Sequence, residues 1–200
     1  MRVGASQNIL ALAKRHGVVR PRDLEKEGIA REHLLRLYRK GILDRVARGV
    51  YVLAEAPVTE HHSLAVAAKQ VPSGIVCLLS ALRFHGLTSQ DPHQVWIAIH
   101  VKSRRPRVSW PPLRIVRSSG RALSEGVKEH VIEHVPVRVY CIAKTIADCF
   151  KYRNKIGIDI AIEGLREAIS GRRASVDEIN HFARICRVER VIRPYLEALA

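Results

Sequence analysis

The sequence predicts an α+β protein of two domains. Three observations lead to this prediction: three apolar-periodic stretches and a short Arg-Gly hairpin fill the first 53 residues, strand-like segments occupy the centre, and amphipathic stretches fill the end. We expect a small helix-and-hairpin domain over residues 1–54. An α+β domain with a small mixed sheet and a helical C-terminal end is expected over residues 55–200.

Two helices are expected first. The segment QNILALAKRHGVV places four apolar side chains on one helical face, between Ser6 as N-cap and Gly17 as C-cap. The segment PRDLEKEG predicts a very short second helix, with Pro21 in its first turn and Gly28 at its end.

A third helix is expected from Ala30 to Lys40, with a basic face. Its three leucines and Tyr38 fall on one side at 100° per residue, which leaves the charged side chains on the other side. After this helix, the segments LDRV and VYVL flank Arg48 and Gly49, and glycine permits the positive φ of a tight hairpin.

Three helices followed by such a hairpin are typical of a winged helix-turn-helix. In this module the third helix enters the major groove of double-stranded DNA, and the hairpin, or wing, contacts phosphate or the minor groove. The predicted DNA contacts are the polar side chains of the third helix and two arginines of the wing: Arg31, Glu32, His33, Arg36, Arg39, Lys40, Arg45 and Arg48.

Charge favours DNA over the alternative that this module binds another protein and that Arg36 pairs with Glu32. Residues 1–53 contain 12 Lys or Arg and 5 Asp or Glu, a net charge of +7, and the whole chain has a net charge of +15. A surplus of this size indicates a polyanionic partner, for which nucleic acid is the natural candidate. Arg36 is the main candidate for base readout.

A second basic block lies outside the first domain. Residues 101–121 contain 7 Lys or Arg and no Asp or Glu, and three prolines predict an irregular loop before a strand at Leu113–Arg117. Three interpretations stay open for this block: it extends the DNA surface, binds RNA, or is a solvated loop. Trp110 either stacks on an unpaired base or packs against the domain. The candidate contacts are Lys102, Arg104, Arg105 and Arg107.

The rest of the chain alternates between strand and helix signals. Thr59 is expected to cap a helix that ends near Pro72, and a central strand is expected over Gln94–His100. Two further strands are expected at Val131–Val135 and Val137–Cys141. The helical spacings that follow predict helices around Ile142–Phe150, Ile158–Ile169, Ser175–Ile185 and Glu189–Leu199, with a capping box of Ser175 and Glu178.

The composition also bears on compartment. No apolar run approaches the roughly 20 residues of a spanning helix, and the segment MRVGASQN lacks the apolar core of a signal peptide. The four cysteines form no CxxC pair and stand among apolar neighbours, as is typical of buried reduced thiols. We therefore expect a cytoplasmic protein that does not bind a membrane.

Three phrases of the chain resemble a known family: GILDRVARGVYVL, SALRFHGL and VRVYCIAKTIADCFKYRNKIGIDIAIEGLREAI. They are similar to the AbiEi type of antitoxin and transcriptional regulator, the regulatory half of two-gene bacterial toxin-antitoxin operons. The resemblance covers about the first 170 residues, and its most specific part is AKTIADCFKYRNKIG. It implies a winged helix that represses its own operon and a C-terminal domain that counters a nucleotidyltransferase-like toxin.

The resemblance also implies functional positions. Its DNA-reading helix corresponds to Ala30–Lys40 and its wing to Arg45–Tyr51. The antitoxin surface is expected in the helix that carries the family phrase, although Asp148 and Lys151 have the alternative role of capping and pairing within the domain. The candidate surface residues are Lys144, Thr145, Asp148, Lys151, Tyr152 and Arg153.

An enzyme is the competing class. A nuclease needs clustered carboxylates that hold a divalent ion, and Asp148, Asp159 and Glu163 are the nearest candidates. The histidine pairs, 61 with 62 and 130 with 134, lack a third ligand at the usual spacing, and no phosphate loop or nucleophile motif is present. We therefore expect no catalytic residues, metal or cofactor, and keep a DNA-processing enzyme as the alternative.

Overall fold

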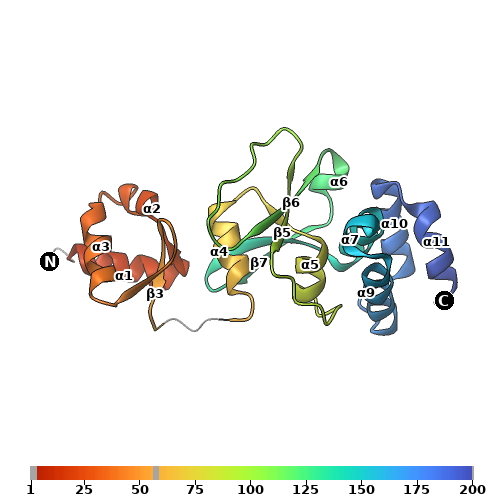
Figure 1. Ribbon diagram of the computed structural model, residues 1–200, viewed down its shortest axis with the longest axis horizontal. Helices are drawn as coiled ribbons and strands as arrows, with labels where there is room; N and C mark the ends of the chain where they lie inside the picture. Colours follow the sequence, from red (N-terminus) through yellow and green to blue (C-terminus); the bar gives the residue numbers. More distant parts are fainter. Residues whose placement is uncertain (1–3, 56–58, 200) are drawn as a thin grey trace. The chain divides into compact units, whose positions relative to one another are not determined.

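The computed structural model describes residues 4–55 and 59–199. It divides into two compact units (Figure 1). The first comprises Met1–Pro72, Pro106–Pro112 and Val131–Val137, and the second comprises Ser73–Arg105, Leu113–His130 and Arg138–Ala200. The mixture of helices and sheets confirms the α+β class. The domain boundary at residue 54 stays a prediction.

The first unit begins with three helices and a three-stranded sheet. The helices are α1 (Ala5–His16), α2 (Pro21–Glu25) and α3 (Arg31–Arg39), and the strands are β1 (Val18–Val19), β2 (Leu43–Ala47) and β3 (Val50–Leu53). The sheet has the order β1-β3-β2, and both pairings are antiparallel. The element order and the hairpin turn at Arg48 and Gly49, where Gly49 has φ +69°, match the sequence prediction.

An apolar core joins these helices to the sheet. Ile9, Leu24, Leu34 and Leu43 have no exposed surface, which explains the apolar spacing of the helices. The prediction of Ser6 as N-cap is wrong, since α1 begins at Ala5, Ser6 lies inside the helix, and Gly4 occupies the N-cap. The remaining core members are Ala13, Val19, Ile29, Leu37 and Tyr51.

The first unit also contains α4 (His62–Gln70) and the turn between β7 and β8. Thr59 does not cap α4, whose N-cap is His61. Instead, the backbone N–H and the hydroxyl of Thr59 both donate to Glu133 Oε1 at 2.9 Å. His62 Nδ1 lies 2.6 Å from the other carboxylate oxygen, Glu133 Oε2. One carboxylate in the turn therefore holds the start of α4.

A five-stranded mixed sheet has the order β6-β5-β4-β8-β7. Strands β4 and β5 are antiparallel, while β4 pairs with β8, and β5 with β6, in parallel. The strands are β4 (Ile75–Val76), β5 (Val95–His100), β6 (Leu113–Ser118), β7 (Val127–Ile132) and β8 (Val135–Tyr140). The predicted central strand and the strand after the basic loop are confirmed.

The last two strands differ from the prediction. The expected break between them is at Pro136, whereas the chain turns at Glu133 and His134, and Pro136 lies inside β8. Both turn residues have positive φ, +49° and +62°. Because hairpin turns of this kind favour Asn and Gly, the sequence carries no local signal for it.

Helices complete the second unit. They are α5 (Leu78–Phe84), α6 (Arg121–Ser124), α7 (Ile142–Lys151), α8 (Arg153–Ile156), α9 (Ile158–Ser170), α10 (Val176–Cys186) and α11 (Glu189–Glu197). Helix α7 lies against α5, α9, α10 and α11 (Figure 1), so the core of this unit surrounds it. The capping box of Ser175 and Glu178 at the start of α10 is confirmed. No helix in the described ranges is long and apolar enough to cross a membrane.

Candidate functional site

Helix α3 presents a charged face to solvent. Leu34 and Leu37 are buried beneath it, whereas Tyr38, predicted to pack inward, is 41% exposed with its ring edge-to-face against Tyr51 at 5.9 Å. His33 is half-buried. The other predicted contacts of this helix are exposed: Arg31, Glu32, Arg36, Arg39 and Lys40.

Arg36 is held by polar neighbours other than Glu32. Its Nη2 donates to His33 Nδ1 at 2.8 Å and to Ser6 Oγ at 3.2 Å. Both bonds are exposed, and the described residues show no ion pair between Arg36 and Glu32. The guanidinium is therefore oriented at the surface without a carboxylate that would neutralise it.

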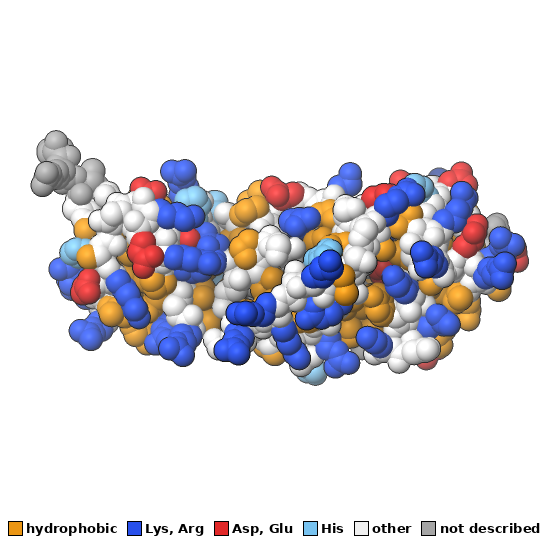
Figure 2. Space-filling model, turned by 90° about the horizontal axis from the view of Figure 1, so that it is seen from above, with side chains coloured by type: hydrophobic (Ala, Val, Ile, Leu, Met, Phe, Trp, Pro, Cys, Tyr) orange, Lys and Arg blue, Asp and Glu red, His pale blue; other side chains and the backbone are white. Residues whose placement is uncertain are grey.

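The β2–β3 hairpin carries the predicted wing arginines. Arg45 and Arg48 are exposed, and Arg45 Nε makes a long hydrogen bond of 3.4 Å to the Ala47 carbonyl, beside an irregularity in the strand register. On the face shown in Figure 2, Lys and Arg side chains surround a few Asp and Glu side chains on the elements next to the grey N-terminal residues. The charge surplus of this part of the chain therefore lies at its surface.

The structure divides the basic loop between the two units. Arg107 belongs to the first unit, whereas Lys102, Arg104 and Arg105 belong to the second, and all four side chains are exposed. The part in the first unit is anchored, because Gln70 Nε2 donates to the Trp110 carbonyl at 2.7 Å. The Trp110 ring is 37% exposed and its centroid lies 5.8 Å from that of His62, so it packs on the protein with one part open to solvent.

The prediction that Lys144, Thr145 and Asp148 form an exposed antitoxin surface is wrong. Lys144 and Thr145 have no exposed surface, and Asp148 is 6% exposed. Helix α7 occupies the centre of the second unit, so other helices cover these positions. Asp148 pairs with Lys144 one helical turn earlier, which agrees with the alternative of pairing within the domain.

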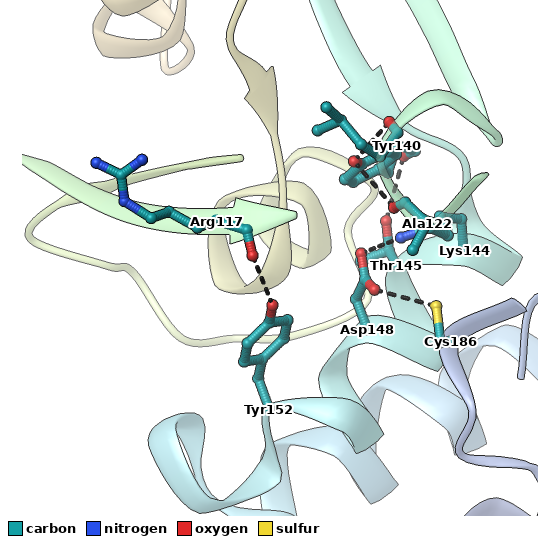
Figure 3. A network of polar contacts seen from close by, with 9 residues as sticks. Arg117, Ala122, Tyr140, Lys144, Thr145, Asp148, Tyr152 and Cys186 are labelled. Atoms are coloured by element: carbon teal, nitrogen blue, oxygen red, sulfur yellow. Dashed lines mark hydrogen bonds and ion pairs between the residues drawn. The ribbon is translucent and has the colours of Figure 1, made fainter. Parts of the chain in front are cut away.

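These residues form a buried polar network (Figure 3). The Lys144 ammonium donates to Asp148 and also lies 4.0 Å from the centroid of the Tyr140 ring. Burial and the Asp148 carboxylate raise the pKa of the Cys186 thiol to about 12, so the thiol stays protonated and donates to Asp148 Oδ1 at 3.3 Å. The Thr145 hydroxyl donates to the Tyr140 carbonyl at 3.2 Å. Each of these side chains has a hydrogen-bond partner inside the protein.

The three remaining antitoxin candidates are half-buried: Lys151 ends α7, Tyr152 follows it, and Arg153 begins α8. The Tyr152 hydroxyl donates to the Arg117 carbonyl at 3.4 Å, and Arg153 Nη1 donates to the Phe150 carbonyl at 2.9 Å. Lys151 Nζ lies 5.7 Å from the centroid of the Tyr152 ring. These side chains reach solvent in part, and their role as a surface stays a prediction.

The carboxylates considered for a nuclease have separate partners. Asp148 is paired with Lys144, while Glu163 accepts from the Thr88 hydroxyl at 3.1 Å and the Ser89 N–H at 3.2 Å. Asp159 is exposed. Within residues 4–55 and 59–199, no group of three or more His, Cys, Asp or Glu side chains is placed to hold a metal ion.

The sequence did not predict the roles of two residues in the first unit. Arg22 is exposed on α2 and lines a concave surface with Arg48, and Glu133 fixes the start of α4. Neither carries a local sequence signal, because their neighbours come from segments far away in the chain. Only Arg22 had an available clue, the overall basic character of residues 1–53.

Comparison with known proteins agrees with this description. Residues 7–54 match a family model described as transcriptional regulator, AbiEi antitoxin. No curated protein matches the chain. The family description names a regulator and not an enzyme. The resemblance is therefore confirmed over the α1–α3 and β2–β3 segment, which is similar to the AbiEi antitoxin family of transcriptional regulators.

Proposed function

We propose that the chain is a sequence-specific DNA-binding repressor that controls its own operon and acts as the antitoxin of a toxin-antitoxin pair. Residues 1–54 would be a winged helix-turn-helix domain, with α3 in the major groove and the β2–β3 hairpin as wing. The family match to a transcriptional regulator supports this proposal. The observation that carries it is the solvent-facing, mostly basic side of α3.

Arg36 is the residue proposed to read a base. Its present hydrogen bonds to Ser6 and His33 are exposed, and bonds of this type contribute about 0.5–1.5 kcal/mol each. A bidentate contact from Arg to guanine is worth about 1–3 kcal/mol of discrimination. The contact with guanine can therefore offset the loss of the hydrogen bonds to Ser6 and His33. Before DNA binds, these two residues orient the Arg36 side chain.

The test is a binding titration with the DNA upstream of the gene and with random DNA of equal length. Arg36→Ala is expected to weaken binding to the upstream DNA by about 1–3 kcal/mol, roughly 5- to 150-fold, and to relax the preference at one base pair. The matched control is Arg190→Ala, an exposed arginine on α11 with the same charge change. An equal loss on both DNAs would identify Arg36 as a phosphate contact and contradict its assignment.

The antitoxin role is tested separately. The proposal is that the chain counters the nucleotidyltransferase-like product of the neighbouring gene, and Lys151, Tyr152 and Arg153 are the candidate contacts that retain access to solvent. Co-expression with that gene is expected to restore growth. Persistent toxicity at full expression of both proteins would reject the antitoxin role and leave the repressor role untouched.

A further inference from the structure

A concave surface of about 240 Å³ lies within the first unit, beside the hairpin turn. Four segments of the chain line it: the start of α2, the hairpin turn, Gln70 at the end of α4, and the loop at 106–108. All of them except α4 contribute arginine side chains. The cationic lining consists of Arg20, Arg22, Arg48 and Arg107, and the described residues that line the surface include no carboxylate.

Direct contacts support this concave surface. The hairpin turn approaches α2 closely, since a Cβ on Gly49 would lie 3.8 Å from Pro21 Cδ. The Arg48 N–H donates to Ser109 Oγ at 3.4 Å, which links the hairpin turn to the loop. Arg20 Nη1 donates to the Lys69 carbonyl, which links α2 to α4. Contacts within the protein thus connect the four segments.

The four arginines differ in their charge balance. Arg20 pairs with Asp23, whose two oxygens accept from Nε and Nη2 at 3.1 Å each. Asp23 also lies 4.0 Å from Lys69 Nζ, so one carboxylate serves two cations. Arg22, Arg48 and Arg107 are exposed, and the described residues provide no ion pair for them.

The excess of cations over carboxylates also affects Lys69, which lies beside this surface. Burial lowers the pKa of Lys69, and although Asp23 opposes this effect, Arg20 and Arg22 add to it. Several cations that share one carboxylate repel one another, and a bound anion relieves that repulsion. Guanidinium groups bind phosphate through paired N–H donors, so a phosphate group is the anion that this lining suits best.

We propose that this concave surface binds one phosphate group of the DNA backbone, next to the base pairs that α3 reads. The inference rests on the proposed function for its choice of DNA. It adds a clamp to the wing, in which Arg22 of α2 and Arg107 of the loop act together with Arg48. The clamp gives affinity that depends on salt and is independent of base sequence.

The test measures the salt dependence of DNA binding by the full chain with Arg22 and Arg107 both replaced by Ala. The slope of log K against log salt is negative, and loss of one phosphate contact makes it shallower by about 0.9. The affinity gap between wild type and variant is then expected to narrow roughly 3.5-fold between 50 and 200 mM salt. Preference for the upstream DNA over random DNA is expected to persist. The control is the charge-matched pair Arg190→Ala and Arg193→Ala, both exposed on α11.

A second arm identifies the source of the phosphate. It uses a set of DNAs in which one backbone phosphate at a time is replaced by a neutral methylphosphonate. At one position, the replacement is expected to make the salt dependence of wild-type binding shallower and to leave that of the double variant unchanged. An unchanged slope in the double variant overturns the proposal. Binding of inorganic pyrophosphate that the double variant loses, with DNA binding intact, would assign the surface to a free phosphate compound and also overturn it.

The two proposals fail in different ways. If wild type binds upstream and random DNA equally, the repressor function is rejected, yet the slope on random DNA still tests the concave surface. If sequence preference is present and the double variant has the wild-type slope, only the concave surface is rejected. The double variant is expected to fold, because its two substituted side chains are exposed. Circular dichroism checks this.

Discussion

Replacing Lys144 with methionine tests whether the polar network of α7 is structural. Methionine keeps the length and most of the volume of lysine, so the substitution removes the charge and leaves little cavity. It deprives Asp148 of its cation and leaves the Cys186 thiol as its hydrogen-bond donor. Because the Asp148 side chain is 8% exposed, water does not compensate.

The expected loss follows from this burial. Removal of one partner from a buried ion pair typically costs about 3–5 kcal/mol, whereas an exposed pair is worth about 0.2–1 kcal/mol. Against a domain stability of about 5–15 kcal/mol, Lys144→Met is expected to remove a large share of the free energy of unfolding.

A double replacement separates charge from packing. Lys144→Met combined with Asp148→Leu removes both charges, and the free energy of unfolding is expected to return to within about 1 kcal/mol of wild type, or above it. Lys151→Met is the matched control on the same helix, where the side chain reaches solvent and the expected change is within about 0.5 kcal/mol.

The assay is urea unfolding, monitored by far-UV circular dichroism. The dependence of the unfolding free energy on urea concentration is compared between variants. A loss below about 1 kcal/mol for Lys144→Met would refute the reasoning, because no buried charge would then have been left unpaired. A double variant that is as unstable as Lys144→Met would also refute it. In that case packing, and not charge, would explain the loss.

Two further predictions concern the turn between β7 and β8. Burial would raise the pKa of Glu133, but hydrogen bonds from Thr59 and His62 lower it below the usual 4.5. The ionised Glu133 carboxylate therefore stabilises the folded protein above pH 4.5, and this stabilisation is lost as the pH falls through the lowered pKa. Glu133→Gln should therefore flatten the acid side of the curve of urea midpoint against pH, and an unchanged curve would contradict this role. Gly17→Ala should destabilise by more than the roughly 1–2 kcal/mol of a left-handed residue, since its Cβ would lie 1.7 Å from the Glu133 carbonyl oxygen. Gly28→Ala, at the same φ of +65° with nothing within 4 Å, is the control in urea unfolding, and equal losses would rule out the close approach.

Local patterns were sufficient to predict most helices, both strands of the β2–β3 hairpin, and strands β5 and β6. In α10, the Ser175 cap and the Glu178 side chain are three residues apart and bond to each other, so the signal is contained in the sequence. In β5, a run rich in β-branched and aromatic residues is buried from Val95 to Ile99, and such residues favour strands. The apolar spacing of α3 likewise predicted the burial of Leu34 and Leu37.

Long-range contacts explain what the sequence could not predict. The turn at Glu133 and His134 has two residues with positive φ and no glycine, and it is held by bonds to Thr59 and His62 some 70 residues earlier. The concave surface beside the hairpin turn gathers Arg22 and Arg107 from distant segments. Neither arrangement follows from periodicity or from a short motif, because the partners are unknown until the chain is folded.

The buried network on α7 also explains why the antitoxin surface was placed wrongly. The resemblance implies a functional surface at the polar residues of this helix, but charged side chains such as Lys144 and Asp148 can also be buried when they are paired. Their spacing of four residues allows them to neutralise each other inside the core. The most specific phrase of the family resemblance therefore contains residues that build the second unit. A contact with a toxin has to be sought among side chains that reach solvent, beginning with Lys151, Tyr152 and Arg153, where a substitution can change binding without unfolding the protein.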